Sequence, residues 1–393
     1  MDKAEFAKKV RESLDRLEKW VEDHNYRAYE PFDGLSSYLM PLTFHKLFLE
    51  RILQQVVRQS PINLRPLLGV RPQESTKGRG YMAWGYLTMF KLTGEAPYRE
   101  KAVALLDWLD KNKAPGYEHH SWANHFAFSS RGGRMPKHFP IIVWTSLIGQ
   151  AYLDAYELLG DARWLDIAKS VCQWILELPR EKTDKGTCLS YGPGGQSSIH
   201  NSNMLGAAML ARASKYLGRE PYLPVAKEAM VYSCSRQLPD GGWYYAEAEN
   251  SHWIDNFHTG YNLDSLKCYV ESSGDTEYEE NLKRGFDFYK AHFFEDTGRP
   301  KYYHTRTYPV DSQCAGQAIE TLSRFSERDP DALGLAMKTA EWWIDNMQSK
   351  KGYFYYREYP LMKAKTPMLH WSQAVTYKGL ALLLSKLPKG SGA

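Results

Sequence analysis

An internal repeat constrains the fold of this chain more than any other feature of its sequence. Four segments begin with a glycine, carry an aromatic residue four positions later, and carry another aromatic residue ten positions after that. The four glycines are Gly94, Gly160, Gly218 and Gly274, and a degenerate fifth copy has Asp329 in the glycine position. Self-similar units of this kind bury a continuous core only by stacking on their neighbours. The repeat therefore predicts an array of similar units.

Each unit has the pattern of two helices joined by a short turn. The segment DARWLDIAKSVCQWILEL, which follows Gly160, places apolar residues at the i, i+3, i+4 and i+7 spacing of an amphipathic helix. The segment NMLGAAMLARASKYLG, which ends at Gly218, is rich in alanine, leucine and methionine and indicates a second helix. Glycine accepts the left-handed conformation that ends a helix. We therefore expect a helix, a glycine turn and a helix in every unit.

The first helix of each pair is more apolar than the second, which predicts an inner and an outer layer. Because the polar loops between pairs need a common centre, we expect a closed ring rather than an open solenoid. The predicted fold class is all-α, an (α/α)6-type toroid of helical hairpins with short β-hairpins on one rim. The predicted inner helices cover residues 80–93, 141–159, 200–217, 259–273, 311–326 and 369–386.

The predicted domain organisation is simple. Residues 76–388 form the toroid, which we expect to be the catalytic domain. Residues 1–75 contain helices that pack on the ring or complete it, and either residues 40–57 or the helix at 3–23 could take this place. The helix at 3–23 is otherwise a packing or oligomer contact. Residues 389–393 form a short tail.

Charge and motif content exclude several classes of protein. The net charge of +4, from 50 basic and 46 acidic residues, is too balanced for a dedicated nucleic-acid binder. No apolar run is long enough to span a bilayer, and the N-terminus lacks the apolar core of a signal peptide, so we expect a cytoplasmic protein without membrane insertion. The five cysteines form no CxxC pair, and neither HExxH nor GxSxG occurs. We expect no metal ion and no cofactor.

Aromatic loops are predicted to gather on one rim of the ring. Aromatic residues make up 14% of the chain, and many follow a glycine in loops that lead into inner helices, as in residues 241–245, 298–304 and 352–359. Alternating bulky residues after a glycine are typical of short strands or hairpins. Tyr and Trp have flat apolar faces and polar edges, which suit a sugar. We therefore expect the functional site on this rim.

Polar and ring-bearing residues are concentrated where these loops meet the inner helices. The segment WIDNFHTGY contributes Trp253, Asp255, Asn256, His258 and Tyr261. A second segment, KYYHTRTYPVD, and the equivalent junctions of the other units contribute Tyr302, His304, Arg306, Gln313, Trp122, His120, His200, Asn203, His370 and Trp371.

These residue types suit abstraction of the proton beside the carboxylate of a uronic acid. His and Tyr can act as base and acid once their pKa values are tuned, and Asn and Arg can neutralise the substrate carboxylate. Such a site gives an epimerase when the proton returns on the opposite face, and a lyase when the glycosidic oxygen leaves. Hydrolysis would need two carboxylates across the sugar, and the spacing of the acidic residues singles out no pair.

Over about residues 75–388 the chain resembles (α/α)-toroid carbohydrate enzymes, in architecture and in the motifs WIDNFHTGY, YPVDSQCAGQAIETL and TPMLHWSQA. In style it is most similar to the catalytic domain of D-glucuronyl C5-epimerase and to the helical domains of polysaccharide lyases. The resemblance implies proton transfer at a uronic acid, with roles for Tyr302, Tyr303, His258 and His304. The N-acylglucosamine 2-epimerase group has a similar length and toroid, but its usual Arg- and His-containing motifs are absent. Terpene cyclases share a related toroid, but their DxDD and DDxxD motifs are absent.

We therefore expect a carbohydrate-active enzyme whose substrate is a glycan containing uronic acid. His258, His304 and Tyr302 are the expected base and acid groups, and Asn256, Arg306 and Gln313 position or neutralise the substrate. The expected stacking surfaces are Trp253, Trp122 and Trp371. Two alternatives stay open. Asp255 is the proton donor if the chain is a hydrolase of the unsaturated uronyl hydrolase type, and a helix cap or histidine partner otherwise; a non-catalytic glycan-binding toroid is the second alternative.

Overall fold

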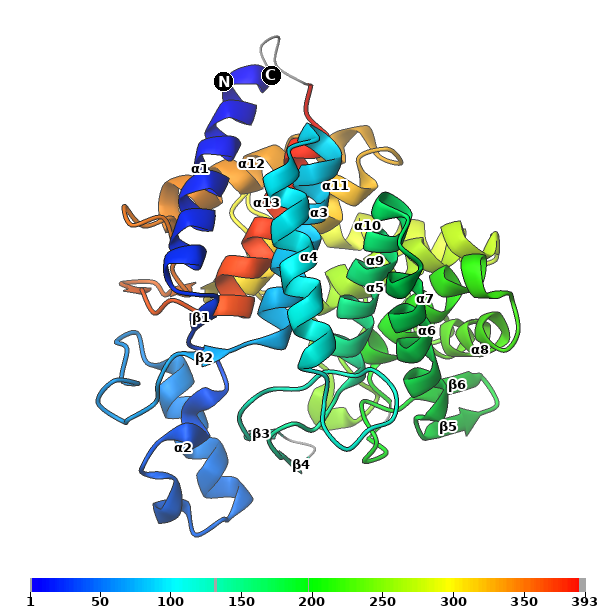
Figure 1. The fold of residues 1–393 in the computed structure, drawn as a ribbon, viewed down its shortest axis with the longest axis horizontal. Coiled ribbons are helices and arrows are strands. Elements are labelled where there is room, and N and C mark those ends of the chain that lie inside the picture. The colour runs from blue at the N-terminus through cyan, green and yellow to red at the C-terminus, as the bar shows by residue number, and fades with distance from the viewer. Residues whose placement is uncertain (1, 131–132, 197, 389–393) are drawn as a thin grey trace.

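The computed structural model describes residues 2–130, 133–196 and 198–388, so the predicted tail at 389–393 lies outside the described residues. In the described part of the chain, helices that are joined by short turns lie side by side (Figure 1). The inner helices are α3 (Thr76–Thr93), α5 (Ile142–Leu159), α7 (His200–Leu217), α9 (Asn256–Ser273), α11 (Ser312–Phe325) and α13 (Val375–Ser385). The predicted positions of the inner helices are confirmed.

The ring is closed. Each inner helix packs against the inner helix that follows it, and α13 packs against both α11 and α3. The open solenoid is therefore wrong, and the predicted all-α toroid is confirmed. The outer helices are α4 (Ala96–Lys111), α6 (Ala162–Glu177), α8 (Tyr222–Cys234), α10 (Glu279–His292) and α12 (Pro330–Met347).

The N-terminal helix α1 (Lys3–Asp23) occupies the outer position beside α13. It packs against α13 and α12, and Tyr377 of α13 donates a hydrogen bond of 2.6 Å to Glu18 of α1. The last inner helix is thus paired with the first helix of the chain. The helices α1 and α13, from the two ends of the described chain, therefore form an outer and inner pair like those of the repeat.

The repeat has a direct structural cause. Gly94 and Gly160 end α3 and α5 with φ values of 75° and 72°, in the left-handed region that glycine adopts without a steric penalty. Most aromatic residues at the two repeat offsets lie on the outer helices and are buried. Tyr98, Trp164 and Trp174 are all buried in this way. The spacing of the repeat therefore records the packing of each outer helix on its inner partner.

The strands are short and antiparallel, and they lie in loops between helices. They pair β1 (Arg27–Ala28) with β2 (Gln73–Glu74), β3 (Phe128–Ser130) with β4 (Gly133–Met135), β5 (Arg180–Thr183) with β6 (Gly186–Leu189), and β7 (Val310–Asp311) with β8 (Arg357–Glu358), which also pairs with β9 (Lys363–Ala364). Residues 241–245 and 298–304, which we expected to form strands, make only isolated bridges or turns. Their Gly-aromatic pattern serves packing between helices instead.

Residues 34–73, here called the α2 region, stand outside the ring at one end of the molecule (Figure 1). They contain the helix α2 (Leu47–Gln59) and end at the first residue of β2, ahead of α3. Arg65 anchors this region by a buried ion pair with Asp33, with a separation of 2.8 Å. Residues 40–57 therefore do not complete the ring.

Candidate active site

The N-terminal ends of the inner helices surround a large cavity. Its volume is about 1360 Å³, which exceeds the range of about 300–1,000 Å³ that is usual for a small-molecule site. Residues at the starts of α3, α5, α7 and α9 line it, together with α2 and the loops at 245–255 and 302–306. The cavity therefore lies on the rim where the sequence predicted the site, and its size suits an extended ligand.

Asp255 and His258 form a fixed pair at the start of α9. Asp255 caps the helix because its Oδ1 accepts a hydrogen bond of 3.0 Å from the backbone N–H of His258. Its Oδ2 accepts a bond of 2.7 Å from His258 Nδ1 and one of 3.0 Å from Trp253 Nε1. Since Nδ1 is occupied, Nε2 is the atom of His258 that is left for proton transfer. Asp255 is therefore both a helix cap and the partner of a histidine.

The segment that carries Tyr302 and His304 lies beside this pair. The backbone N–H of Asn256 donates to the Tyr302 carbonyl at 2.8 Å, and Asp255 and Tyr303 form an antiparallel bridge. Burial raises the pKa of the Tyr302 phenol well above its usual value, although the charge of Arg58 opposes the shift. The Tyr302 phenol therefore keeps its proton at neutral pH. His304 Nδ1 donates to the Ile254 carbonyl at 3.3 Å, which leaves its Nε2 as an acceptor.

Trp371 and His370 form a second wall of the cavity at the start of the last inner helix, in the π-helical turn Leu369–Ala374. Trp371 Nε1 donates to Asp311 Oδ1 at 2.8 Å, which fixes the indole ring. His370 is buried, and its Nδ1 contacts a carboxylate oxygen of Glu30; burial lowers the pKa of its imidazole, although the charge of Glu30 opposes the shift. The Trp371 ring also meets Phe257 edge to face at 5.4 Å. These contacts make this wall rigid.

The floor of the cavity is a network of phenols with one amine. Tyr261 Oη receives hydrogen bonds from Lys77 Nζ at 3.3 Å and from Gln313 Nε2 at 2.9 Å, and it lies 2.8 Å from Tyr81 Oη. Burial lowers the pKa of Lys77 to about 7, and the neighbouring charge of Lys378 adds to the shift. No carboxylate of the described residues makes an ion pair with Lys77. Lys77 is therefore an amine that can change its charge near neutral pH.

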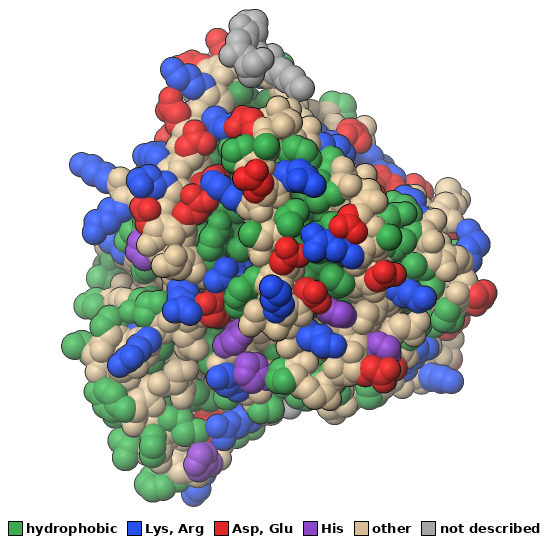
Figure 2. Space-filling model, viewed as in Figure 1, with side chains coloured by type: hydrophobic (Ala, Val, Ile, Leu, Met, Phe, Trp, Pro, Cys, Tyr) green, Lys and Arg blue, Asp and Glu red, His purple; other side chains and the backbone are tan. Residues whose placement is uncertain are grey.

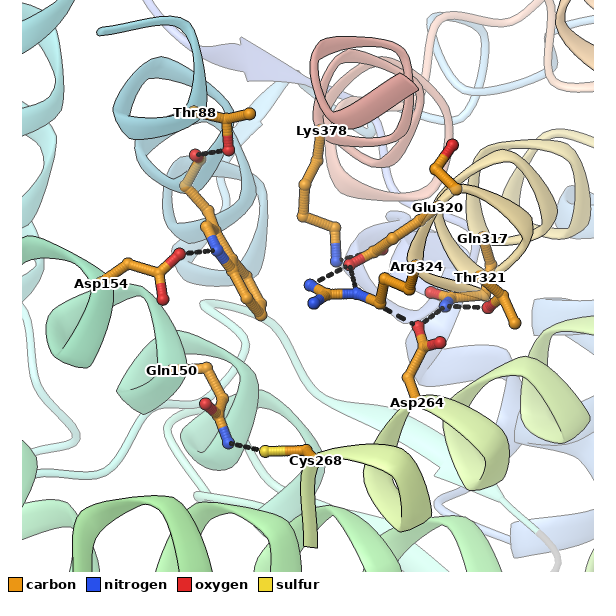
Figure 3. A network of polar contacts seen from close by, with 12 residues as sticks. Thr88, Gln150, Asp154, Asp264, Cys268, Gln317, Glu320, Thr321, Arg324 and Lys378 are labelled. Carbon is orange, nitrogen blue, oxygen red and sulfur yellow. Dashed lines mark hydrogen bonds and ion pairs between the residues drawn. The ribbon is translucent and has the colours of Figure 1, made fainter. Parts of the chain in front are cut away.

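Beyond this floor, the axis of the ring is filled by charges that neutralise one another (Figure 3). Glu320 of α11 forms ion pairs with Lys378 at 2.6 Å and with Arg324 at 2.8 Å. Asp264 accepts a hydrogen bond of 2.8 Å from Gln317, and burial raises the pKa of this carboxyl group to about 7. A smaller cavity of about 280 Å³ shares Tyr261 with the larger one. Because these charges pair with one another, they are not available to a ligand. A charged ligand would therefore bind better in the larger cavity.

The charge of the large cavity is positive. Among the described residues that line it, the basic residues are Arg51, Arg58, Arg306 and the partly charged Lys77, and the acids are Asp255 and Glu247. Both acids are already engaged: Asp255 by His258, and Glu247 by His200 Nε2 at 2.8 Å. The hydrogen bond from His200 lowers the pKa of Glu247. Unpaired positive charge in a cavity of this kind favours an anionic ligand.

Comparisons with known proteins identify the architecture. The sequence matches no family model and no curated protein. Among solved structures, a cellobiose 2-epimerase from Bacillus thermoamylovorans is similar with a TM-score of 0.64 and 10% identity, over 81% of this chain and 90% of that one. A polysaccharide lyase is similar with a TM-score of 0.60 and 12% identity, over 98% and 97%. A glycosyl hydrolase of family 88 from Bacteroides vulgatus is similar with a TM-score of 0.56 and 12% identity, over 79% and 90%.

The chain has the fold of (α/α)-toroid carbohydrate-active enzymes. The expected resemblance is therefore confirmed at the level of the fold. Because these identities are so low, the comparison shows the fold alone. The chemistry has to be inferred from the residues that line the cavity. Among the described residues, no helix is long and apolar enough to cross a membrane, and no group of three His, Cys, Asp or Glu side chains could hold a metal ion.

The structure brings most of the expected site residues to the cavity. Those that line it are Trp253, Asp255, His258, Tyr261, Tyr302, His304, Arg306, His370 and Trp371. They come from loops and helix starts that are far apart in the sequence. Their convergence results from the closure of the ring, which places the N-terminal ends of inner helices around one opening.

Six expected substrate-binding residues lie elsewhere, and their polar groups have structural partners. Trp122 is fully buried in the core, and its Nε1 donates to the Leu109 carbonyl at 2.9 Å. His120 contacts Asp110 and Ser170 outside the cavity. The other four are buried behind the cavity wall. Asn203 donates to the Ala229 carbonyl, His200 pairs with Glu247, Asn256 accepts from Tyr289, and Gln313 donates to Tyr261.

The sequence interpretation missed the cations Arg51, Arg58 and Lys77. Arg51 and Arg58 come from α2, which is far from the repeat in sequence and carried no site motif. Lys77 lies in the first turn of the first inner helix, in the segment STKGRG. A lysine at the start of an inner helix, where the other units carry polar rim residues, is the signal that could have identified it.

Proposed function

We propose that the chain is a carbohydrate-active enzyme that binds an acidic sugar and abstracts the proton beside its carboxylate, as an epimerase or a lyase. The observation that carries this proposal is the combination of a positive cavity with a histidine, His258, whose ring is fixed by Asp255. The positive charge suits a uronic acid. The fixed imidazole offers one nitrogen, Nε2, to the substrate.

The role of each residue in the proposed reaction follows from its protonation state. His258 Nε2 takes the proton from the carbon beside the carboxylate, and Asp255 stabilises the imidazolium that forms. Arg58, together with Lys77 in its protonated form, neutralises the charge that moves onto the carboxylate oxygens during this step. Tyr302, whose phenol is protonated, donates a proton. In an epimerase it returns the proton to the opposite face of the same carbon. In a lyase the bond from the adjacent carbon to the glycosidic oxygen breaks, and Tyr302 protonates that oxygen.

Hydrolysis with Asp255 as the proton donor has less support. Both oxygens of Asp255 accept hydrogen bonds from N–H groups, so a proton on this carboxylate would displace one of them. Glu247, the other acid of the described cavity lining, is engaged by His200. Most glycoside hydrolases need two available carboxylates across the scissile bond.

Incubation with a panel of uronic-acid glycans in deuterated water tests this function. Deuterium at the carbon beside the carboxylate indicates epimerisation, and new ultraviolet absorbance of a conjugated double bond indicates elimination. His258→Gln should lower the rate by about 10²–10⁴-fold. His24→Gln is the matched control, because His24 is exposed at the end of α1 and remote from the cavity. New reducing ends without either signal would support hydrolysis, and saturable binding without any reaction would support a glycan-binding protein.

A further inference from the structure

The α2 region carries an exposed apolar face. Among the described residues, nearly all large apolar side chains that are exposed to solvent belong to this region or to one neighbouring turn, and Tyr216 is the exception. The exposed fractions of Phe44, Phe48 and Leu67 are 72%, 70% and 73%. Figure 2 shows hydrophobic side chains gathered at the end of the molecule where Figure 1 draws α2. The residues of this apolar face are Tyr38, Leu42, Phe44, Leu47, Phe48, Ile52, Val56, Ile62 and Leu67.

A second apolar element continues this face. In the turn between β8 and β9, Leu361 is 97% exposed and Met362 is 49% exposed. Tyr359 of the same turn donates a hydrogen bond of 3.0 Å to the carbonyl of Gln59 at the end of α2. Two segments that are 300 residues apart in the sequence thus expose apolar side chains next to each other. Scattered apolar residues are normal on a surface, but a concentrated group indicates an interaction site.

The exposed charged residues of the α2 region are basic. Residues 34–73 contain a single acidic residue, Glu50, which is buried and bonded to Ser129 at 2.6 Å. Lys46 and Arg71 of the same region are exposed, and so is Lys365 beside the apolar turn. A self-complementary contact between two copies of this face would bring these like charges together. The charge therefore argues against a second copy of the chain as the partner.

We propose that the α2 region binds the surface of a membrane that contains anionic lipids. Apolar side chains with a basic border and no exposed acid are the composition of helices that lie in the interface of a bilayer. Only side chains of the α2 region enter the headgroup layer, so the chain binds the membrane peripherally. The apolar face and the positive border act together: the first is buried among lipid chains, and the second pairs with anionic headgroups.

The same helix connects this surface to the cavity. On α2, Phe48, Ile52 and Val56 follow one another at intervals of four residues and are exposed. Arg51, Gln55 and Arg58 form a different stripe that lines the cavity. Adsorption would therefore hold the cavity wall within about 10 Å of the lipid, which is the width of one helix. This inference does not depend on the reaction that occurs in the cavity.

Co-sedimentation of the full chain with vesicles tests the proposal. Vesicles of phosphatidylcholine and phosphatidylglycerol should bind the chain, and vesicles of phosphatidylcholine alone should bind it much more weakly. Phe48→Ser/Ile52→Ser should reduce binding at least about tenfold, because the double variant removes apolar area that the bound chain buries in the lipid. Lys46→Glu/Arg71→Glu should reduce binding by about fivefold or more for each cation, and added salt should do the same.

The control replaces exposed lysines of other elements, in Lys8→Glu/Lys283→Glu on α1 and α10. It should bind like the unchanged chain, and circular dichroism should show that all variants are folded. Absence of binding to either vesicle would overturn the proposal, and so would unchanged binding of Phe48→Ser/Ile52→Ser. Dimerisation that is measured by sedimentation and lost in Phe48→Ser/Ile52→Ser would assign the face to a second copy instead.

Discussion

At the scale of single residues, Asp255 connects the fold to the proposed chemistry. One carboxylate oxygen caps α9 and the other holds the ring of His258. Asparagine caps a helix about as well as aspartate, but it does not carry the charge that stabilises an imidazolium. The substitution Asp255→Asn therefore separates the two roles.

Asp255→Asn should reduce kcat by about 10²–10⁴-fold, with KM changed little. Its free energy of unfolding should fall by less than about 1 kcal/mol, since the cap remains. Steady-state kinetics and urea denaturation measure the two quantities. Full activity in this variant would show that the Asp255–His258 pair is structural only. A parallel loss of activity and stability would show that the cap is the main role of Asp255.

Lys77 gives a prediction about stability and pH. Its folded-state pKa of about 7 lies below the value of about 10.5 in an unfolded chain. Between these two values the unfolded chain binds the proton and the folded chain does not, so stability rises with pH. Relative to Lys77→Met, the unfolding free energy of the unchanged chain should increase by about 1–3 kcal/mol from pH 7 to pH 9. Urea denaturation at the two pH values measures this difference, and a difference that stays constant would contradict it.

Local motifs predicted part of the site because their partners are near in sequence. Asp255 and His258 are three residues apart, so one helix start was enough to place both. Lys77 and Arg58 could not be identified in the same way. Lys77 acquires its character from burial beside Tyr261, which is 184 residues away, and Arg58 reaches the cavity only because the α2 region folds over the rim. Conversely, Trp122 matched a rim motif but is buried in the core.

At the scale of elements, the glycine turns make the boundaries of the inner helices predictable. Gly160 has a φ of 72° and no atom near its missing side chain, so a substitution there meets strain without crowding. Gly334 lies within α12, is equally open, and has ordinary helical geometry. The α2 region lacks this repeat, and its position could not be predicted. It depends on the ion pair between Arg65 and Asp33 and on contacts with distant loops.

Gly160→Ala and Gly334→Ala form a matched pair that tests this account. Gly160→Ala should lower the unfolding free energy by about 1–2 kcal/mol, which is the cost of the left-handed conformation for a residue with a side chain. Gly334→Ala should raise it by about 0.5–1 kcal/mol, because alanine loses less backbone entropy in a helix. Thermal or urea denaturation measures both. Equal shifts in the two variants would mean that the turn conformation does not limit the helix end.

At the scale of the whole molecule, closure of the ring makes the cavity a single site. The helices α3, α5, α7 and α9 each bring one part of the lining, and the contact of α13 with α3 and α11 holds them in a circle. The periodic pattern predicted the helices and their layers. The contact that closes the ring joins α13 to α3, at the two ends of the repeat. The sequence indicated this contact only indirectly, because the polar loops would share one centre only in a closed ring.

Gly379 lies on the last inner helix, where α13 approaches α11 so closely that an added Cβ would lie 2.5 Å from the Gly316 carbonyl oxygen. Gly379→Ala must therefore push the two helices apart, at a cost of about 1–3 kcal/mol. If the closed ring unfolds as one unit, circular dichroism and tryptophan fluorescence should report the same lowered midpoint in urea. Gly334→Ala, with the same chemical change in open space, should not show this loss. Two separate transitions in Gly379→Ala would mean that the ring opens at this contact before the rest unfolds, and that the two halves of the cavity are stabilised independently.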